Sequence, residues 1–161
     1  MLPMEIDEFL TKSEGIWISM RSGHSLAFKQ FEEIVSTIRI KLLNKEDLKV
    51  KDLLEKSKYL KTEVTKPFEM EWQGESNWGS KENNEEFKGS SVLLPIALSN
   101  QKGHFIRSMG YTEKIPVISK YFFLSDGTLV ISTSYENTIA EERIWFASQN
   151  LRCRSSIIRS L

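Results

Sequence analysis

The stretch EERIWFASQNLRCRSS, Glu141 to Ser156, decides the fold that we predict for this chain. Two runs of residues flank the polar triplet Ser148-Gln149-Asn150, which suits a tight turn. In the second run Arg152 and Arg154 alternate with apolar neighbours, as residues of a strand do. A hairpin like this can hold two guanidinium groups and a carboxylate on one wall of a cavity. We expect the rest of the chain to build that cavity.

The length of the turn decides which side chains share a face with the two arginines, because a shift of one residue moves every side chain to the other face. A two-residue loop at Gln149-Asn150 places Trp145 and Arg143 with the arginines. An odd-numbered loop gives three other cross-strand pairs: Phe146 with Arg152, Ile144 with Arg154 and Glu142 with Ser156. Both pairings stay open at this point.

Alternation of apolar and polar residues predicts strands along most of the chain. Asp126-Gly127 is a strong hairpin signal between two of them. We predict strands at Ile16 to Arg21 with an extended continuation over His24 to Phe28, at Phe31 to Leu43, Thr65 to Gln73, Ser91 to Leu98, His104 to Met109, Val117 to Leu124, Thr128 to Tyr135, Glu141 to Ser148 and Leu151 to Ile158.

Three further segments have other patterns. Met4 to Lys12 has apolar residues at i, i+3 and i+4, which is typical of a short amphipathic helix. Lys45 to Lys58 suits at least one helical turn, or else a polar connector. Gly74 to Lys88 is polar and predicts a long loop, which carries Trp78.

These elements predict an all-β fold within one domain, residues 1–161. About nine or ten short strands with no parallel crossover favour an antiparallel up-and-down β-barrel, with the leading helix capping one end. A barrel of about this size has room for one small ligand. A sandwich with Greek-key connections is the alternative architecture.

The composition excludes several classes of function. Lys plus Arg and Asp plus Glu both number 22, and this balance argues against non-specific nucleic-acid binding. The single cysteine, Cys153, excludes an internal disulfide and fits a reducing compartment. His24 and His104 lie far apart and no zinc-ligand spacing occurs, so we expect no metal. No apolar run is long enough to span a membrane, and we expect a cytoplasmic protein.

Arg21, Arg152 and Arg154 are candidates for binding an anion, because guanidinium groups grip carboxylates through paired hydrogen bonds. Glu142 is their natural partner. The alternative is that this face is exposed, with solvated arginines and a plain surface ion pair.

Several other side chains have both a structural and a functional interpretation. Met70 and Trp72 suit either the core or a ligand wall, whereas Trp78 in its polar loop could fold over a flat ligand. His24 is either a structural histidine or a donor to a ligand carboxylate. Cys153 alternates with the arginines and favours an inert thiol.

Four motifs resemble the S-type phycobiliprotein lyases, the bilin lyases of cyanobacteria, their phages and some algae. They are SEGIWISMRSGHSLAF, FEMEW, GYTEKIPVISKYFF and EERIWFASQNLRCRSS, and the resemblance spans nearly the whole chain. It implies a barrel like those of lipocalins and fatty-acid-binding proteins. It also implies an enzyme that binds a free linear tetrapyrrole and attaches it by a thioether bond to a cysteine of a phycobiliprotein subunit.

The resemblance implies roles for individual residues. Glu142, Arg152 and Arg154 would be catalytic, and this grouping favours the odd-loop pairing. The bilin-binding residues that the resemblance implies are Arg21, Met70, Trp72, Trp78 and Ser156. We add His24 to the expected bilin-binding residues for its own chemistry, as a donor to a ligand carboxylate. The bilin, phycoerythrobilin or phycocyanobilin, would be a substrate and not a covalently bound cofactor.

The expected partners are the bilin and the acceptor subunit, with a homodimer left open. A bilin carrier without a catalytic step is one alternative function. A lipid-binding barrel of the fatty-acid type is another.

Overall fold

The computed structural model describes residues 2–76, 87–108 and 116–161. Nine strands form one antiparallel sheet, and each strand pairs with the next in the sequence. The nine are β1 (Gly15–Ser25), β2 (Gln30–Leu42), β3 (Phe68–Ser76), β4 (Phe87–Ala97), β5 (Lys102–Arg107), β6 (Val117–Phe123), β7 (Leu129–Tyr135), β8 (Thr138–Ser148) and β9 (Leu151–Ser160). The predicted meander is therefore confirmed, and the Greek-key sandwich is wrong.

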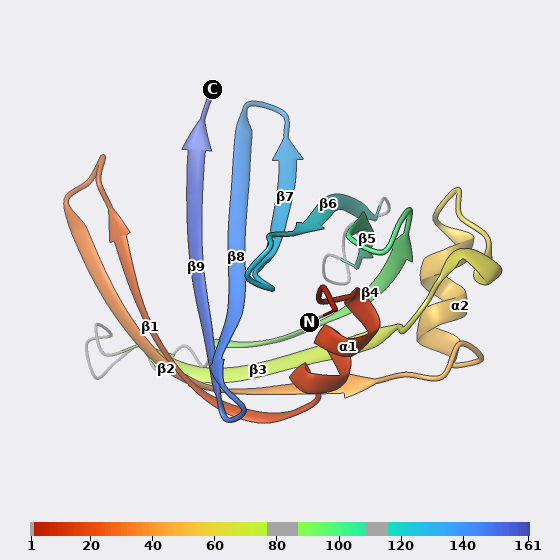
Figure 1. Ribbon diagram of the computed structural model, residues 1–161. Helices are drawn as coiled ribbons and strands as arrows, with labels where there is room; N and C mark the ends of the chain where they lie inside the picture. Colours follow the sequence, from red (N-terminus) through yellow and green to blue (C-terminus); the bar gives the residue numbers. More distant parts are fainter. Residues whose placement is uncertain (1, 77–86, 109–115) are drawn as a thin grey trace.

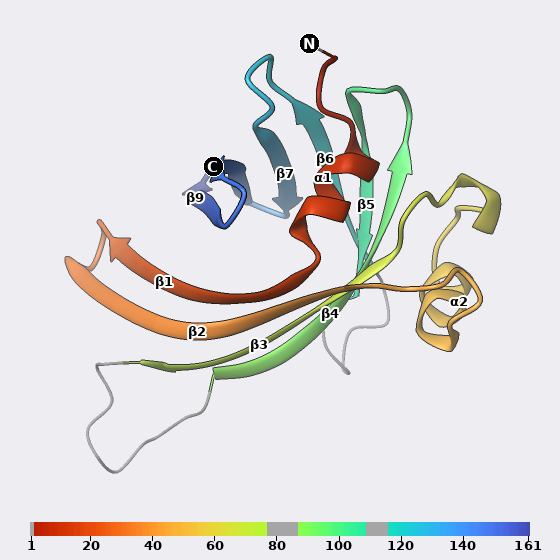
Figure 2. The ribbon, with the colours of Figure 1, turned by 60° about the horizontal axis from the view of Figure 1, so that its bottom comes forward.

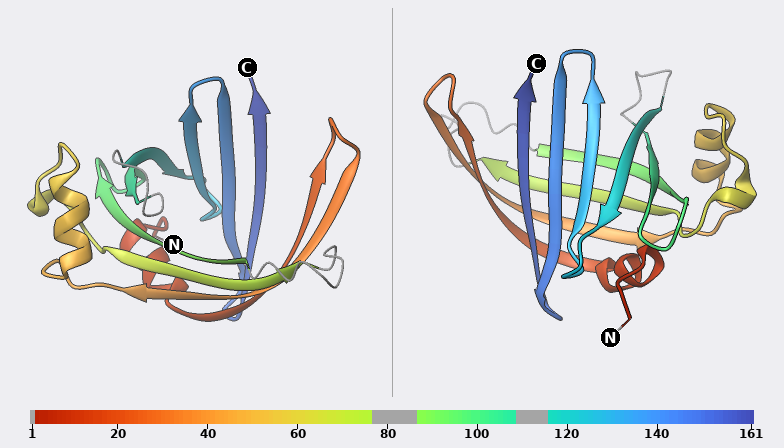
Figure 3. Two further views of the ribbon diagram at one scale, coloured as in Figure 1. Left: turned by 180° about the vertical axis from the view of Figure 1, so that it is seen from behind. Right: turned by 45° about the horizontal axis from the view of Figure 1, so that its top comes forward.

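The sheet curves into an open half-barrel. Its order begins at β1 and ends at β9, so these two are edge strands. Strands β1 to β4 sweep across the molecule, and β7 to β9 stand at a steep angle to them (Figures 1 and 3). The curvature leaves one concave face, toward which alternate residues of every strand point.

Helix α1 (Ile6–Ser13) closes one end of the half-barrel, as predicted (Figure 2). Ile6, Phe9 and Leu10 are buried in the main core, which collects residues from β2 to β8. The Phe9 ring lies 5.2 Å from the ring of Phe146 and 5.7 Å from that of Phe123, centroid to centroid. A helix of eight residues is marginal alone, so this apolar contact holds it in place.

A second core lies on the convex face, under α2 (Leu48–Glu55). Val50, Leu53 and Leu54 of α2 pack against apolar residues of β4 and β5, which settles the choice between helix and connector in favour of the helix. A short 3₁₀ turn, η1 (Lys61–Glu63), leads from α2 toward β3. Among the described residues, no helix is long and apolar enough to cross a membrane.

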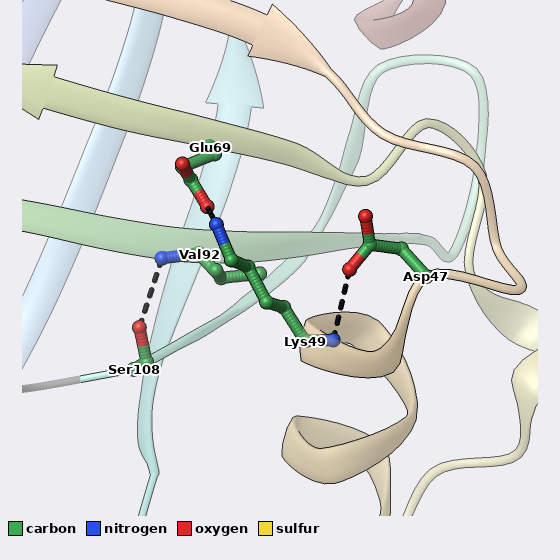
Figure 4. A network of polar contacts seen from close by, with 5 residues as sticks. All are labelled: Asp47, Lys49, Glu69, Val92 and Ser108. Carbon is green, nitrogen blue, oxygen red and sulfur yellow. Dashed lines mark hydrogen bonds and ion pairs between the residues drawn. The ribbon is translucent and has the colours of Figure 1, made fainter.

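Polar contacts fasten α2 to the sheet (Figure 4). Asp47 caps the helix by accepting a hydrogen bond from the backbone N–H of Lys49. Lys49 in turn donates to the buried carboxylate of Glu69 on β3, with 2.5 Å between Nζ and Oε2. That hydrogen bond raises the pKa of Lys49. Because α2 covers the convex side, the concave side above α1 is left for the candidate site.

Candidate functional site

The β8–β9 hairpin has the cross-strand pairs that we expected from an odd-numbered loop: Phe146 with Arg152, Ile144 with Arg154 and Glu142 with Ser156. The turn itself has only two residues, because Ser148 pairs directly with Leu151. A register shift between Phe146 and Ser148 supplies the extra residue. A β-bulge at Ala147, and not the length of the loop, therefore selects the pairing.

This register turns the polar side chains of the hairpin toward the concave face. Ile144 is buried in the core, and Phe146 packs against it beside Phe9 and Trp17. Side chains two residues apart share a face. Glu142 on β8 therefore points inward, and so do its neighbours on β9 (Arg152, Arg154 and Ser156).

Glu142 and Arg154 form an ion pair across the hairpin, with 2.6 Å between Oε1 and Nη2. The side chain of Glu142 is 17% exposed and that of Arg154 is 42% exposed. Exposed ion pairs add little to stability, typically about 0–1 kcal/mol. Their value here is geometric, because the pair holds one carboxylate and one guanidinium at known positions on the concave wall.

Arg152 is the electrostatically strained member of the set. Its Nε atom is buried and has no hydrogen-bond partner. The pKa of Arg152 is lowered to about 10, mainly by burial and also by the nearby charge of Arg154, while Glu142 acts in the opposite direction. A desolvated cation beside a second cation is unfavourable unless an anion joins it. The arrangement is therefore suited to receiving a carboxylate.

Strands β1 and β3 provide a positive group and aromatic surface on the opposite wall. Arg21 on β1 shares the inward face of Trp17 and is exposed. Met70 on β3 packs against the core from the same side, and Trp72 follows two residues later, half-buried. These side chains offer an apolar surface next to a positive group.

Gly89 on β4 determines where the Trp72 indole lies. The two residues are direct cross-strand partners. A Cβ atom added at Gly89 would come within 2.4 Å of Cζ2 of Trp72, so the indole lies across the bare glycine backbone. We did not predict this residue. We expected the strand to begin at Ser91, whereas β4 begins at Phe87 and puts Gly89 opposite Trp72.

One expected residue, His24, does not join the set in the structure. His24 has the opposite parity to Arg21 on β1, and it lies exposed on the convex face with its ring 4.8 Å from that of Phe31. The step Ser22-Gly23 permits a β-bulge that would reverse this parity, but the β1–β2 register runs through it without a shift. The expectation that His24 faces the ligand is therefore corrected. Trp78 lies outside the described residues.

The structure also places Ser156 and Cys153. Ser156 is exposed on the inner face of β9 opposite Glu142. Cys153 pairs with Trp145 and points to the convex side, away from the arginines. In the described part of the chain, no cluster of three or more His, Cys, Asp and Glu residues could hold a metal ion.

The chemistry of the concave wall fits a flat, largely apolar molecule that carries carboxylates. Met70 and Trp72 offer surface to its rings, and Arg152 and Arg154 offer charge-assisted hydrogen bonds to its acids. Glu142 adds an acceptor for N–H groups. This combination points to a conjugated ligand with both acidic and N–H functions.

Comparison with known proteins agrees with this site. The model of the CpeS-like protein family matches residues 5–161. A chromophore lyase CpcS/CpeS of Trichodesmium erythraeum is 45% identical over 159 residues, which cover 98% of this chain and 90% of the relative. A relative from Microchaete diplosiphon, named provisionally as the phycoerythrobilin lyase CpeS, is 39% identical over 93% of this chain and 66% of its own length.

A solved structure shows the same fold. The S-type phycobiliprotein lyase CPES from Guillardia theta superposes with a TM-score of 0.87 at 36% sequence identity, covering 98% of this chain and 84% of that one. The resemblance noted from the four motifs is thus confirmed over nearly the whole chain. The chain belongs to the CpeS-like family of chromophore lyases.

Proposed function

We propose that this lyase binds a free linear tetrapyrrole on the concave face of its sheet and transfers it to a cysteine of a phycobiliprotein subunit. The observation that carries the proposal is the buried, unpartnered Nε of Arg152 beside the Arg154–Glu142 ion pair. A bilin has two propionates, a row of pyrrole nitrogens and flat apolar rings. It would meet each group on this wall with a matching partner.

Each residue has a distinct role in this proposal. Arg152 and Arg154, with Arg21 on the facing strand, bind propionate or ring carbonyl oxygens. Met70 and Trp72 cover ring faces, and Ser156 lies within the same wall. Burying about 200 Å² of ring surface contributes roughly 5 kcal/mol at ~25 cal/mol/Å². The apolar wall therefore supplies affinity, while the charged groups set orientation.

The reaction is the addition of a thiol to a carbon–carbon double bond. The sulfur of the acceptor cysteine bonds to the ring-A ethylidene carbon, the π electrons move into ring A, and a proton completes the addition with no leaving group. Glu142 accepts hydrogen bonds from pyrrole N–H groups and favours the protonated, more electrophilic chromophore. The lyase otherwise acts by holding the bilin in one geometry with ring A accessible.

The choice of bilin is part of the proposal. We propose phycoerythrobilin, because the Microchaete diplosiphon relative bears that assignment in its name. Phycocyanobilin is the alternative. An absorbance titration with each free bilin, followed by a candidate acceptor subunit, shows which chromophore becomes covalently attached.

Glu142→Gln tests the activating role of the carboxylate, because glutamine keeps the shape and removes the charge. We expect the variant to bind bilin but to transfer it at least tenfold more slowly. Transfer at the wild-type rate would exclude activation by Glu142. Arg143→Gln is the matched control, since Arg143 is exposed on the convex face of the same strand.

A carrier that only protects the bilin is the competing function. It predicts that the lyase does not accelerate correct addition to one acceptor cysteine relative to free bilin. A fatty-acid barrel predicts lipid affinity and no colour change with bilin. We also propose that the lyase acts in the cytoplasm. Light scattering tests whether it forms a homodimer.

A further inference from the structure

A second arginine on the concave face, Arg107, lies outside the set described above and is half-buried. Arg107 ends β5, and its Nε is buried without a hydrogen-bond partner, as that of Arg152 is. The ion pairs within the described residues do not include it. A buried N–H group without an acceptor is unfavourable, so this guanidinium is suited to receiving an anion at that atom.

The parity of β5 turns Arg107 inward. Phe105 belongs to the main core and Ile106 to the core under α2, so the two faces of β5 are assigned without ambiguity. Arg107 follows Phe105 by two residues and shares its face. Its cross-strand partner on β4 is Leu93, which also belongs to the main core.

Arg107 and Arg152 each adjoin an aromatic side chain of the main core. Arg152 pairs with Phe146, which touches the α1 residue Phe9. Arg107 is the next residue after Phe105 on the inner face of β5. The ring of Phe105 contacts both Phe68 and Tyr121. Both arginines therefore lie next to aromatic residues at the same core, Phe105 and Phe146.

The two arginines are on different walls. Arg152 is on the edge strand β9, and Arg107 is on β5, the middle strand of the nine. In a sheet curved into a half-barrel, the middle strand lies across the concave face from the edges (Figure 1). A ligand that packs against these aromatic residues would have one guanidinium group on each side.

We propose that Arg107 binds one carboxylate of the substrate while Arg152 and Arg154 bind the other. The proposal rests on the proposed function, in which the ligand is a dicarboxylic tetrapyrrole. Two separated anion positions specify a ligand with two acid groups. They also fix the line along which the tetrapyrrole lies between the two walls. Arg107 is thus a binding and orienting residue.

The first experiment uses the wild-type protein and chemically modified ligand. Free phycoerythrobilin, its two monomethyl esters and its dimethyl ester are titrated by absorbance. We expect each monoester to bind about tenfold or more weakly, and the dimethyl ester to lose both contributions. Equal affinity for the diacid and one of the monoesters would overturn the second anion position. Failure of every form to bind would instead overturn the proposed function.

The second experiment assigns that position to Arg107. Arg107→Gln should lower affinity for the diacid about tenfold or more and bind one monoester no worse than the diacid. Arg107→Lys, which keeps the charge, should recover part of the loss. Arg39→Gln on the exposed outer face of β2 is the control and should change nothing. Wild-type affinity and unchanged ester discrimination in Arg107→Gln would refute the assignment. Circular dichroism checks the folding of both variants.

Discussion

Gly89→Ala tests whether the position of Trp72 controls ligand binding. The new methyl group would lie 2.4 Å from Cζ2, 2.7 Å from Cε2 and 3.0 Å from Nε1 of the indole. Ordinary contact begins near 3.4 Å, so the ring must retreat by about 1 Å or more. Because Trp72 is only half-buried, the indole can swing toward the open side, and the fold should survive.

The expected result is a loss of bilin affinity with little loss of stability. Stacking of one aromatic ring contributes about 0.5–1.5 kcal/mol beyond its buried area. A displaced indole should therefore weaken binding by roughly three- to tenfold or more. Absorbance titration measures the affinity, and urea denaturation measures the free energy of unfolding.

Two controls make the interpretation specific. Gly23→Ala adds the same methyl group to a strand where the nearest atom, the carbonyl oxygen of Glu32, is 4.0 Å away, and it should bind bilin normally. In a Trp72→Ala background, Gly89→Ala should cause no further loss. Wild-type affinity of Gly89→Ala, or an equal loss in the Trp72→Ala background, would refute the reasoning.

Two further predictions concern buried ionisable groups. Arg152→Leu should stabilise the unliganded protein by about 1–3 kcal/mol, because it removes a desolvated charge. The same substitution should weaken bilin binding at least tenfold. Urea denaturation measures the change in stability, and bilin titration measures the change in affinity. Burial raises the pKa of Tyr121 to about 12, so between pH 10 and 12 the native state keeps a proton that the unfolded state loses. Stability should fall through that window by roughly 3 kcal/mol. Arg152 acts in the opposite sense there, because its lowered pKa of about 10 makes stability rise with pH. The comparison of wild type with Tyr121→Phe isolates the contribution of the tyrosine. If the melting temperatures of both proteins fall equally between pH 10 and 12, the prediction is wrong.

Much of the fold could be predicted because strand periodicity is local. Alternation assigned Met70 and Trp72 to one face of β3 and Arg152 and Arg154 to one face of β9, and the structure agrees. The expectation that His24 faces the ligand is wrong, because it needed a bulge at Ser22-Gly23 that the β1–β2 ladder does not contain. A Ser-Gly step permits a bend without requiring one, and pairing with β2 decided the outcome.

By itself, the amino-acid sequence determined the number and direction of the strands, the capping helix and the residue types that could hold an acidic ligand. Only the tertiary structure decided which of these residues meet. The bulge at Ala147 turned Glu142 toward the arginines, and Gly89 on a neighbouring strand set the place of Trp72. Packing between distant strands buried the Nε atoms of Arg107 and Arg152. The physical reason is that side-chain alternation depends on the backbone of one strand, whereas register, close approach and burial depend on segments far apart in the chain.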